Sequence, residues 1–269
     1  MINSCRAQLP MPIALAGVGP SGESALQRLR AQQQPNVHFL RNDDSLAPDL
    51  LHKFGLLILV AELESVEDCN AVQALAQKVQ SSGFGTNTLY VVMKPAATVG
   101  ERQKVLAHYS LQMLEMHADA TVVVPENSGE DLGVWLTDRV ASLAQAVAND
   151  AFAGIDVDDL TGLLRNAGST VWASAQSEGV DRVDAAVKAI CKQHAQHVSV
   201  EPVYQQAMIW VQGARESLKL SEMRSLMKSL GQQILKDTPR LVFCVAYDES
   251  LGTRMRVSAL LCRPQMRSS

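Results

Sequence analysis

The sequence lacks the features that would place it in a membrane or on a nucleic acid. No apolar run approaches the roughly 20 residues that a membrane-spanning helix needs. The first residues, Met1–Arg6, do not show the charged and then apolar pattern of a signal peptide. The 24 Lys and Arg against 28 Asp and Glu form no basic stripe, which argues against a nucleic-acid partner. We therefore expect a cytoplasmic protein that does not insert directly into a membrane.

Cysteine is also scarce. The five cysteines are odd in number and widely spaced, a pattern typical of reduced thiols in the cytosol rather than of a disulfide framework. Cys191, His194 and His197 form C-x-x-H-x-x-H, but positions i and i+6 of a helix diverge, so we predict no metal site there. Apolar residues make up 47% of the chain and charged residues 19%, as in a globular protein.

A glycine-rich turn stands near the start of the chain. The apolar run Pro12–Ala16 stops at Gly17, Gly19 and Gly22, and an amphipathic helical pattern follows. In such a strand, turn and helix, the backbone N–H groups and the helix dipole favour a phosphate. The G-x-G-x-x-G spacing also fits a dinucleotide site, with Asp43 as its acidic residue. Because glycine turns are common in α/β folds, a purely structural turn remains an alternative.

Nearly continuous apolar runs alternate with helical patterns in the first half of the chain. We expect strands at residues 37–40, 56–60, 88–93 and 120–125, with helices after most of them. This alternation indicates a parallel sheet that is covered on both faces. A long helix is expected over residues 131–150, followed by an acidic loop at 154–159.

A second α/β unit is expected after that helix. Its strands fall near residues 169–174, 207–211, 240–247 and 255–261. The short loop between the last two strands predicts that they pair antiparallel. The chain is thus expected to divide into domains 1–152 and 153–269. Three tryptophans in apolar contexts are expected in the core: Trp135, Trp172 and Trp210.

Several motifs resemble those of FtsZ, the bacterial tubulin homologue, in the same order. Gly17–Ala25 resembles the first phosphate loop, Val91–Pro95 resembles V-V-T-K-P, and Val122–Asn127 resembles I-V-I-P-N. Later, Gly179–Arg182 resembles the end of S-G-E-D-R, and Phe243–Val257 resembles G-A-x-x-D-E-x-L-x-x-x-x-R-V. The chain is identified as a shortened, divergent member of the FtsZ/tubulin superfamily. The implied fold is α/β: an N-terminal Rossmann-like parallel sheet, a long central helix and a C-terminal α/β domain with a mixed sheet.

The resemblance implies a GTP site, but the most diagnostic loop of the family is missing. Where FtsZ has G-G-G-T-G-T-G, this chain has no glycine and four carboxylates, those of Glu62, Glu64, Glu67 and Asp68. Glycines let a phosphate approach backbone N–H groups. Two like charges 4 Å apart repel by on the order of 4 kcal/mol at an effective dielectric of about 20, or roughly a thousandfold in affinity. Alternatively, these acids begin the next helix, where they suit the helix dipole.

The resemblance also implies which residues would hold a nucleotide if binding is retained. These are Gly17, Gly19, Gly22, Ser24 and Asp138, with GTP or GDP and Mg²⁺ as cofactors. Ser24 replaces a base-contacting Asn of the family, and Asp138 falls where FtsZ has a guanine-contacting Asn or Asp. A solvated helix acid is the alternative interpretation of Asp138.

FtsZ hydrolyses GTP between subunits through an acidic loop, N-x-D-x-x-D. The matching stretch starts at Asp156 and is read as two residues shorter, with Asp158 and Asp159 as vestigial counterparts of the two aspartates. Because a general base needs exact placement, we expect no confident catalytic residue. In a head-to-tail stack these acids would face Glu62–Asp68 of the next copy, which disfavours a self-filament of the FtsZ type. Asp156, Asp158 and Asp159 are therefore interface candidates for another partner.

Three functions follow from these observations. The preferred one is a pseudo-GTPase without a cofactor that acts by protein–protein interaction, as a modulator of cell division or cytoskeletal filament assembly. Its expected partner is FtsZ or another cytoskeletal protein. The alternatives are an atypical GTPase and a structural protein that self-assembles without nucleotide.

Overall fold

The computed structural model describes residues 12–31, 36–40, 53–82, 87–96, 98–125, 131–147, 151–153, 155–165, 167–197 and 204–263. The strands are β1 (Ile13–Val18), β2 (Val37–Leu40), β3 (Leu56–Glu62), β4 (Asn87–Met93), β5 (Ala120–Val124), β6 (Ala151–Ala153), β7 (Gly168–Ser177), β8 (Gln206–Gly213), β9 (Arg240–Tyr247) and β10 (Met255–Cys262). The helices are α1 (Gly19–Ala31), α3 (Val66–Ser82), α4 (Glu101–His117), α5 (Leu132–Ala146), α6 (Val157–Leu164), α7 (Arg182–His197) and α8 (Leu220–Gln233), with a 3₁₀ turn η2 (Glu249–Leu251).

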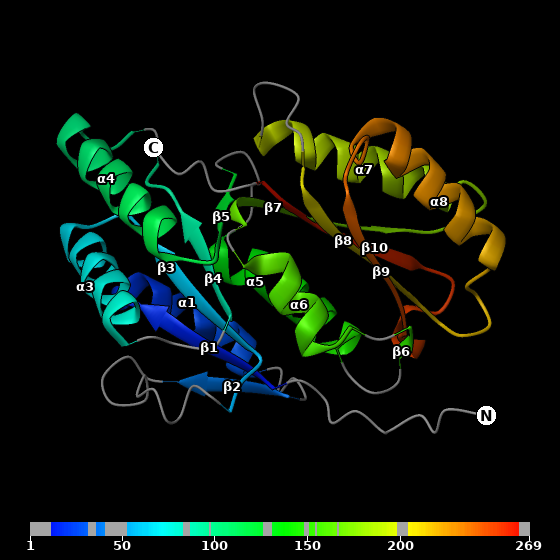
Figure 1. Ribbon diagram of the computed structural model, residues 1–269, viewed down its shortest axis with the longest axis horizontal. Coiled ribbons are helices and arrows are strands. Elements are labelled where there is room, and N and C mark those ends of the chain that lie inside the picture. The colour runs from blue at the N-terminus through cyan, green and yellow to red at the C-terminus, as the bar shows by residue number, and fades with distance from the viewer. Residues whose placement is uncertain are drawn as a thin grey trace.

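One 10-stranded sheet runs through the molecule in the order β2-β1-β3-β4-β5-β7-β10-β8-β9-β6 (Figure 1). Strands β1 to β5 are parallel to one another, and β7 continues the parallel set from β5. In the second half, β10 runs antiparallel to both β7 and β8. Strand β1 is buried along its whole length, as expected of an apolar run in a parallel sheet with helices on both faces. The predicted α/β class, with a parallel first half and a mixed second half, is confirmed.

Three apolar cores hold helices against the sheet. Helices α1, α5 and α6 share one core, which spans both halves of the sheet. The opposite face is covered by α3 and α4 in the first half and by α7 and α8 in the second (Figure 1). Trp135, Trp172 and Trp210 lie in the shared core with at most 2% of their surface exposed, so their predicted core position is confirmed.

The predicted pairing of the last two strands is wrong. β9 and β10 run in opposite directions, but β8 lies between them and hydrogen-bonds to both. The chain passes over the end of β8 through η2, where the Asp248 N–H donates to the Gly213 carbonyl (3.0 Å). A short loop between two strands therefore does not show that they pair with each other, because this loop crosses the end of β8, which lies between β9 and β10.

The central helix is shorter in the described residues than the sequence predicts. α5 ends at Ala146, and residues 148–150 of the predicted helix lie outside the described residues. β6 follows at Ala151–Ala153 and pairs with β9 at the far edge of the sheet. The division into two domains at residue 152 stays a prediction, and that boundary falls inside β6. Within the described residues, no helix is both long and apolar enough to cross a membrane.

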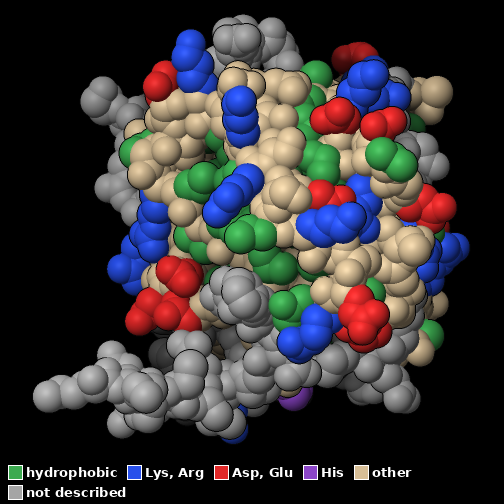
Figure 2. All heavy atoms as spheres, turned by 90° about the vertical axis from the view of Figure 1, so that its right-hand side faces the viewer, with side chains coloured by type: hydrophobic (Ala, Val, Ile, Leu, Met, Phe, Trp, Pro, Cys, Tyr) green, Lys and Arg blue, Asp and Glu red, His purple; other side chains and the backbone are tan. Residues whose placement is uncertain are grey.

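The face shown in Figure 2 carries both signs of charge. Lys and Arg side chains are interspersed there with Asp and Glu and with hydrophobic side chains. No basic patch dominates this face, in keeping with the net charge of −4.

Candidate functional site

The candidate site lies where the strand order reverses. The chain goes from β1 outward to β2 and then returns to β3 on the other side of β1. In open α/β sheets, ligands bind in the crevice at the carboxyl ends of the strands at such a reversal. The glycine turn after β1 and the acidic segment after β3 both lie there, so the structure brings together the two segments singled out from the sequence. Asp43, the acidic residue of the dinucleotide interpretation, lies outside the described residues.

The three glycines of the turn are required by the fold itself. A Cβ atom at Gly17 would lie 2.5 Å from the Glu23 backbone nitrogen, and one at Gly22 would lie 2.2 Å from the Val60 carbonyl oxygen. Gly19 has φ +73°, a left-handed conformation that side chains disfavour. The turn is therefore tight enough to need glycine whether or not a ligand binds.

The carboxylate of Asp68 occupies the N-terminus of α1. Its Oδ1 accepts the Ser21 backbone N–H (3.2 Å), and its Oδ2 accepts the Ser21 hydroxyl (3.0 Å) and the Ser65 hydroxyl (2.6 Å). Asp68 is only 1% exposed. The first turn of a helix attracts anions through its free N–H groups and its dipole. An internal carboxylate thus occupies the end of the helix at which a phosphate loop presents its donors.

Gly19 and Ser65 make this arrangement possible. A Cβ atom at Gly19 would lie 2.4 Å from Asp68 Oδ1, so only glycine lets the carboxylate approach the turn. Ser65 Oγ also accepts the Asp68 backbone N–H (3.0 Å) and thereby caps α3. The acids at Glu67 and Asp68 do begin a helix, as one interpretation of the sequence proposed. Asp68 in addition reaches the glycine turn, which that interpretation did not foresee.

A cavity of about 320 Å³ lies beside this contact. The side chains that give it its charge are Glu62, Asp131 and Arg28, and Ser21 and Ser24 line it as well. Arg28 pairs with Asp131 (3.3 Å) across exposed side chains. Glu62 has a pKa raised to about 7, mainly by burial and further by the nearby carboxylates of Glu64, Asp68 and Asp131.

These residues do not fit a nucleotide phosphate. The Ser21 N–H and hydroxyl at the α1 N-terminus already bind Asp68. Burial, and after it the nearby carboxylates, raise the pKa of Glu62 at the end of β3 to about 7. A phosphate would add negative charge where negative charge is already disfavoured. In the described residues, no group of three His, Cys, Asp or Glu side chains is arranged to hold a metal ion.

The structure separates Asp138 from Ser24. Asp138 pairs with Arg256 of β10 (Oδ1 to guanidinium, 3.1 Å) and lines a different cavity, beside α7. On the same helix, Gly133 lies against α1, where a Cβ would come within 2.9 Å of the Ala25 carbonyl. Asp138 and Ser24 therefore line different cavities, and a nucleotide-binding role for the two residues stays a prediction.

The segment expected as an acidic loop is the start of a helix. Asp156 is the N-cap of α6, and its Oδ1 accepts the Asp159 N–H (2.6 Å). Asp158 and Asp159 lie in the first turn, where the helix dipole stabilises them. Asp156 and Asp159 stand three residues apart, which is itself D-x-x-D spacing.

α6 packs at the amino end of the parallel strands. Asn87, the first residue of β4, donates its amide to Thr161 of α6 (2.7 Å). Glu62 lies at the opposite, carboxyl end of β3. The two acidic groups therefore belong to opposite ends of the sheet and form two separate surfaces.

Sequence reasoning missed Ser21 and Asp131. Ser21 supplies two of the donors to Asp68, and Asp131 caps α5 by accepting the Val134 N–H (2.8 Å). The spacing Ser65-x-x-Asp68 is that of a capping box, and it could have located the start of α3. Nothing in the sequence indicates that Asp68 contacts a residue 47 positions earlier.

No protein-family model matches the chain. Over 188 residues it is 26% identical to the cell division protein FtsZ of Neisseria meningitidis and 25% identical to that of Neisseria gonorrhoeae. These matches cover 64% of the chain and 47% of each relative, so the chain spans about half the length of the curated relatives it matches.

Solved structures match over nearly the whole chain. A mutant FtsZ of M. jannaschii gives a TM-score of 0.79 at 16% identity, covering 96% of this chain and 92% of that one. CetZ from Methanosaeta thermophila gives 0.72 at 15% identity, covering 95% and 87%. TubZ protofilaments of Bacillus thuringiensis serovar israelensis give 0.69 at 10% identity, covering 97% and 91%. The fold is that of the FtsZ/tubulin-like proteins. Sequence and fold together show that the chain is homologous to FtsZ.

Proposed function

We propose that this chain is an FtsZ-like pseudo-GTPase, which binds no nucleotide and acts by protein–protein contact on cell division or cytoskeletal filament assembly. The observation that carries the proposal is the carboxylate of Asp68 on the Ser21 N–H and hydroxyl at the N-terminus of α1. No cofactor is needed for such a role.

Energetics favour the internal carboxylate over a nucleotide. Hydrogen bonds to a charged group contribute about 1.5–3 kcal/mol each, and Asp68 accepts three from side-chain or backbone donors. A phosphate would have to displace this buried carboxylate and then share the crevice with Glu62 and Asp131. Both steps weaken binding, which supports loss of GTPase activity.

The relatives suggest the kind of partner. CetZ2 of Haloferax volcanii and TubZ form protofilaments, so a filament of FtsZ is the partner we propose. The start of α6, with the exposed Asp158 and the half-buried Asp156 and Asp159, is the proposed contact surface. It lies at the opposite end of the sheet from the acidic crevice, so stacking two copies of this chain head to tail would set acid against acid. We therefore propose capping of a genuine filament rather than self-assembly.

Calorimetry with GTP and GDP, with and without Mg²⁺, tests the first part. We expect no heat of binding and no thermal stabilisation up to millimolar ligand. Micromolar binding would overturn the proposal and favour an atypical GTPase that uses Ser24 and the neighbouring cavity.

Light scattering of assembling FtsZ tests the second part. We expect substoichiometric amounts of the chain to reduce scattering, and we expect Asp158→Lys to abolish this effect. Asp184→Lys is the matched control, because Asp184 is also exposed in the first turn of a helix but on α7. Scattering by the chain alone, without GTP, would instead support a self-assembling structural protein.

A further inference from the structure

Helix α4 exposes a stripe of large side chains on the side that faces away from the sheet. Val105 is 68% exposed, Tyr109 52% and Met116 60%, and Gln112 between them is exposed as well. Residues at this spacing lie on one face of an α-helix. Single exposed apolar side chains are ordinary on a protein surface, whereas a row of them marks a contact surface.

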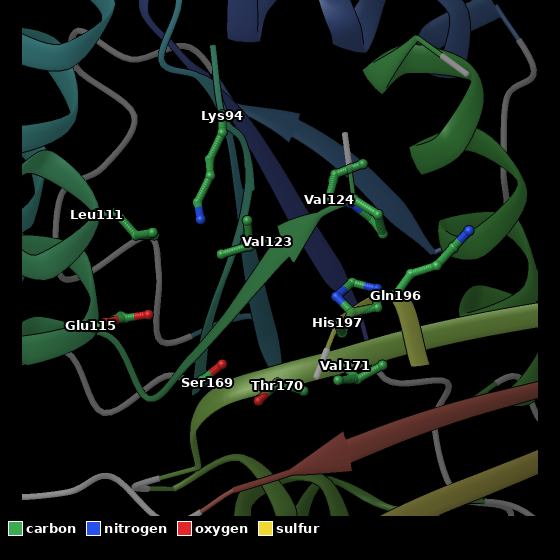
Figure 3. A pocket seen from close by; sticks show the side chains of 11 residues that line it. Lys94, Leu111, Glu115, Val123, Val124, Ser169, Thr170, Val171, Gln196 and His197 are labelled. Atoms are coloured by element: carbon green, nitrogen blue, oxygen red, sulfur yellow. The ribbon is translucent and has the colours of Figure 1, made fainter. Parts of the chain in front are cut away.

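The opposite face of α4 already packs against the sheet. Ala107, Leu111 and Leu114 belong to the apolar core that lies under α3 and α4. In Figure 3, Leu111 and Glu115 point from α4 into the cavity between this helix and the end of β5, so they too belong to the inner side. A single chain therefore uses only the inner face of α4, and the α4 stripe stays uncovered.

The pattern of the α4 stripe indicates what covers it. Val105, Tyr109, Gln112 and Met116 are separated by four, three and four positions, the alternation of d and a positions in a coiled coil. A stripe made of these two positions alone is the narrow pattern by which one helix packs against one other helix. The pattern therefore favours a helix as the partner over an extended peptide.

A second copy of α4 fits this stripe. The spacing of four, three and four reads the same in both directions, so an antiparallel copy presents the same pattern in reverse. Val105 then lies opposite Met116 of the second copy, and Tyr109 lies opposite Gln112 of the second copy. The Tyr109 hydroxyl can donate a hydrogen bond to the Gln112 amide oxygen. Such a contact uses the same surface on both copies and has two-fold symmetry.

The charges at the two ends of α4 also favour the antiparallel arrangement. Arg102 is exposed in the first turn, where the helix dipole disfavours a cation. Glu101 in the same turn is paired with Lys104 (2.8 Å). The last carbonyls make the other end of α4 negative, and Asp119 follows them. An antiparallel copy sets each Arg102 near the negative end of its neighbour, whereas a parallel copy would set Arg102 beside Arg102.

We propose that two copies of this chain form a dimer through antiparallel α4 helices. The dimer is independent of the proposed pseudo-GTPase function, because neither Asp68 nor the acidic residues of α6 lie on α4. A two-fold contact closes after two copies, so it does not require a filament of the FtsZ type. A standard interface buries about 800 Å² per partner. Because a narrow stripe offers less, we expect a dissociation constant in the micromolar range.

Sedimentation velocity from submicromolar to high micromolar chain tests the dimer. We expect the sedimentation coefficient to rise from that of a monomer to that of a dimer. Tyr109→Lys should weaken the dimer about tenfold or more, because it places a cation in the middle of the contact. Val180→Lys is the matched control, because Val180 is also apolar and exposed (98%) but lies before α7. A chain that stays monomeric throughout, or equal effects of the two variants, would overturn the proposal.

Cysteine cross-linking tests the orientation of the two helices. A mixture of Val105→Cys and Met116→Cys chains should form a disulfide-linked dimer under mild oxidation. Each variant alone should cross-link no more than the unmodified chain, whose own cysteines give the background. Both positions are exposed, so neither substitution disturbs the core. The antiparallel dimer is contradicted if Val105→Cys chains cross-link with one another, or if the mixture stays at the background.

Discussion

At the scale of single residues, the Asp68 carboxylate accepts hydrogen bonds at the N-terminus of α1, where a phosphate-binding loop would bind the phosphate of its ligand. Removing its side chain leaves the Ser21 N–H and hydroxyl without their acceptor. We expect Asp68→Ala to lower the free energy of unfolding by about 1–3 kcal/mol. Added acetate or inorganic phosphate should restore much of this loss, because a free anion can then bind the exposed N-terminus of α1.

Urea denaturation with and without the anion measures this rescue. Glu67→Ala is the control, because Glu67 lies in the same first turn of α3 but is exposed. Equal anion effects on Asp68→Ala and on the unmodified chain would show that Asp68 does not occupy an anion site.

Glu62 should make stability depend on pH. Its folded-state pKa of about 7 exceeds the ordinary 4.5, so the protonated form is the one that the fold favours. This contribution is fully present below about pH 4.5 and is lost as the pH rises through about 7. Relative to the unmodified chain, Glu62→Gln should therefore gain stability between pH 5 and 8.

Thermal unfolding of both proteins across this range measures the difference. Glu64→Gln serves as the control, because Glu64 is exposed beside the same crevice. A difference between Glu62→Gln and the unmodified chain that does not change with pH would contradict the raised pKa.

The residues of the site were only partly predictable from the sequence. The glycines and the acidic residues can be identified in the sequence, and the apolar runs before them predict that they lie at the ends of β1 and β3. Which carboxylate points inward cannot be predicted from the sequence, because the Asp68 contact depends on the close approach of the first turns of α1 and α3, at residues 47 positions apart. Asp138 lies on the predicted helix, but its direction depends on Arg256, which the packing of β10 brings beside it.

At the scale of elements, Arg182 joins three segments of the second half. It bonds both carboxylate oxygens of Glu222 on α8 (2.8 and 2.7 Å) and the Thr253 carbonyl (2.7 Å) while it is 6% exposed. We expect Glu222→Ala to cost about 3–5 kcal/mol, because it leaves a buried cation without its partner. Chemical denaturation measures this cost.

An exposed ion pair provides the comparison. Glu101→Ala breaks the Lys104 contact (2.8 Å) on α4, where Glu101 is 85% exposed, and should cost less than about 1 kcal/mol. Similar losses in both variants would mean that Arg182 does not depend on Glu222.

The elements themselves were largely predictable, because each is marked by local patterning. β1, β3, β4 and β5 are continuous apolar runs, and helices with a clear 3.6-residue period lie between them. Strand pairing was less predictable. β10 lies between β7 and β8 because its residues complete cores on both faces there. The sequence of the loop between β9 and β10 does not predict which strands β10 pairs with.

At the scale of the whole molecule, the shared core links the two halves. Leu26 of α1, Trp135 of α5 and Trp210 of β8 belong to one apolar cluster, and β5 pairs directly with β7. Trp172 contacts both other tryptophans, with ring centroids 6.0 and 6.4 Å apart. We therefore expect the two halves to unfold together in one cooperative transition.

Urea titrations followed by tryptophan fluorescence and by far-UV circular dichroism test this cooperativity. The two curves should coincide, because fluorescence reports the shared core and circular dichroism reports all helices. Separate midpoints would show that the predicted division near residue 152 is also a division in stability.

The contact between Asp68 and α1 also bears on timing. A carboxylate tethered to its own binding site has a high effective concentration there, and it cannot diffuse away or be hydrolysed. Because the crevice holds a side chain and not a hydrolysable nucleotide, its occupancy would not change with time after the chain has folded. The lifetime of any assembly that it joins would then be set by the chemistry of the partner alone.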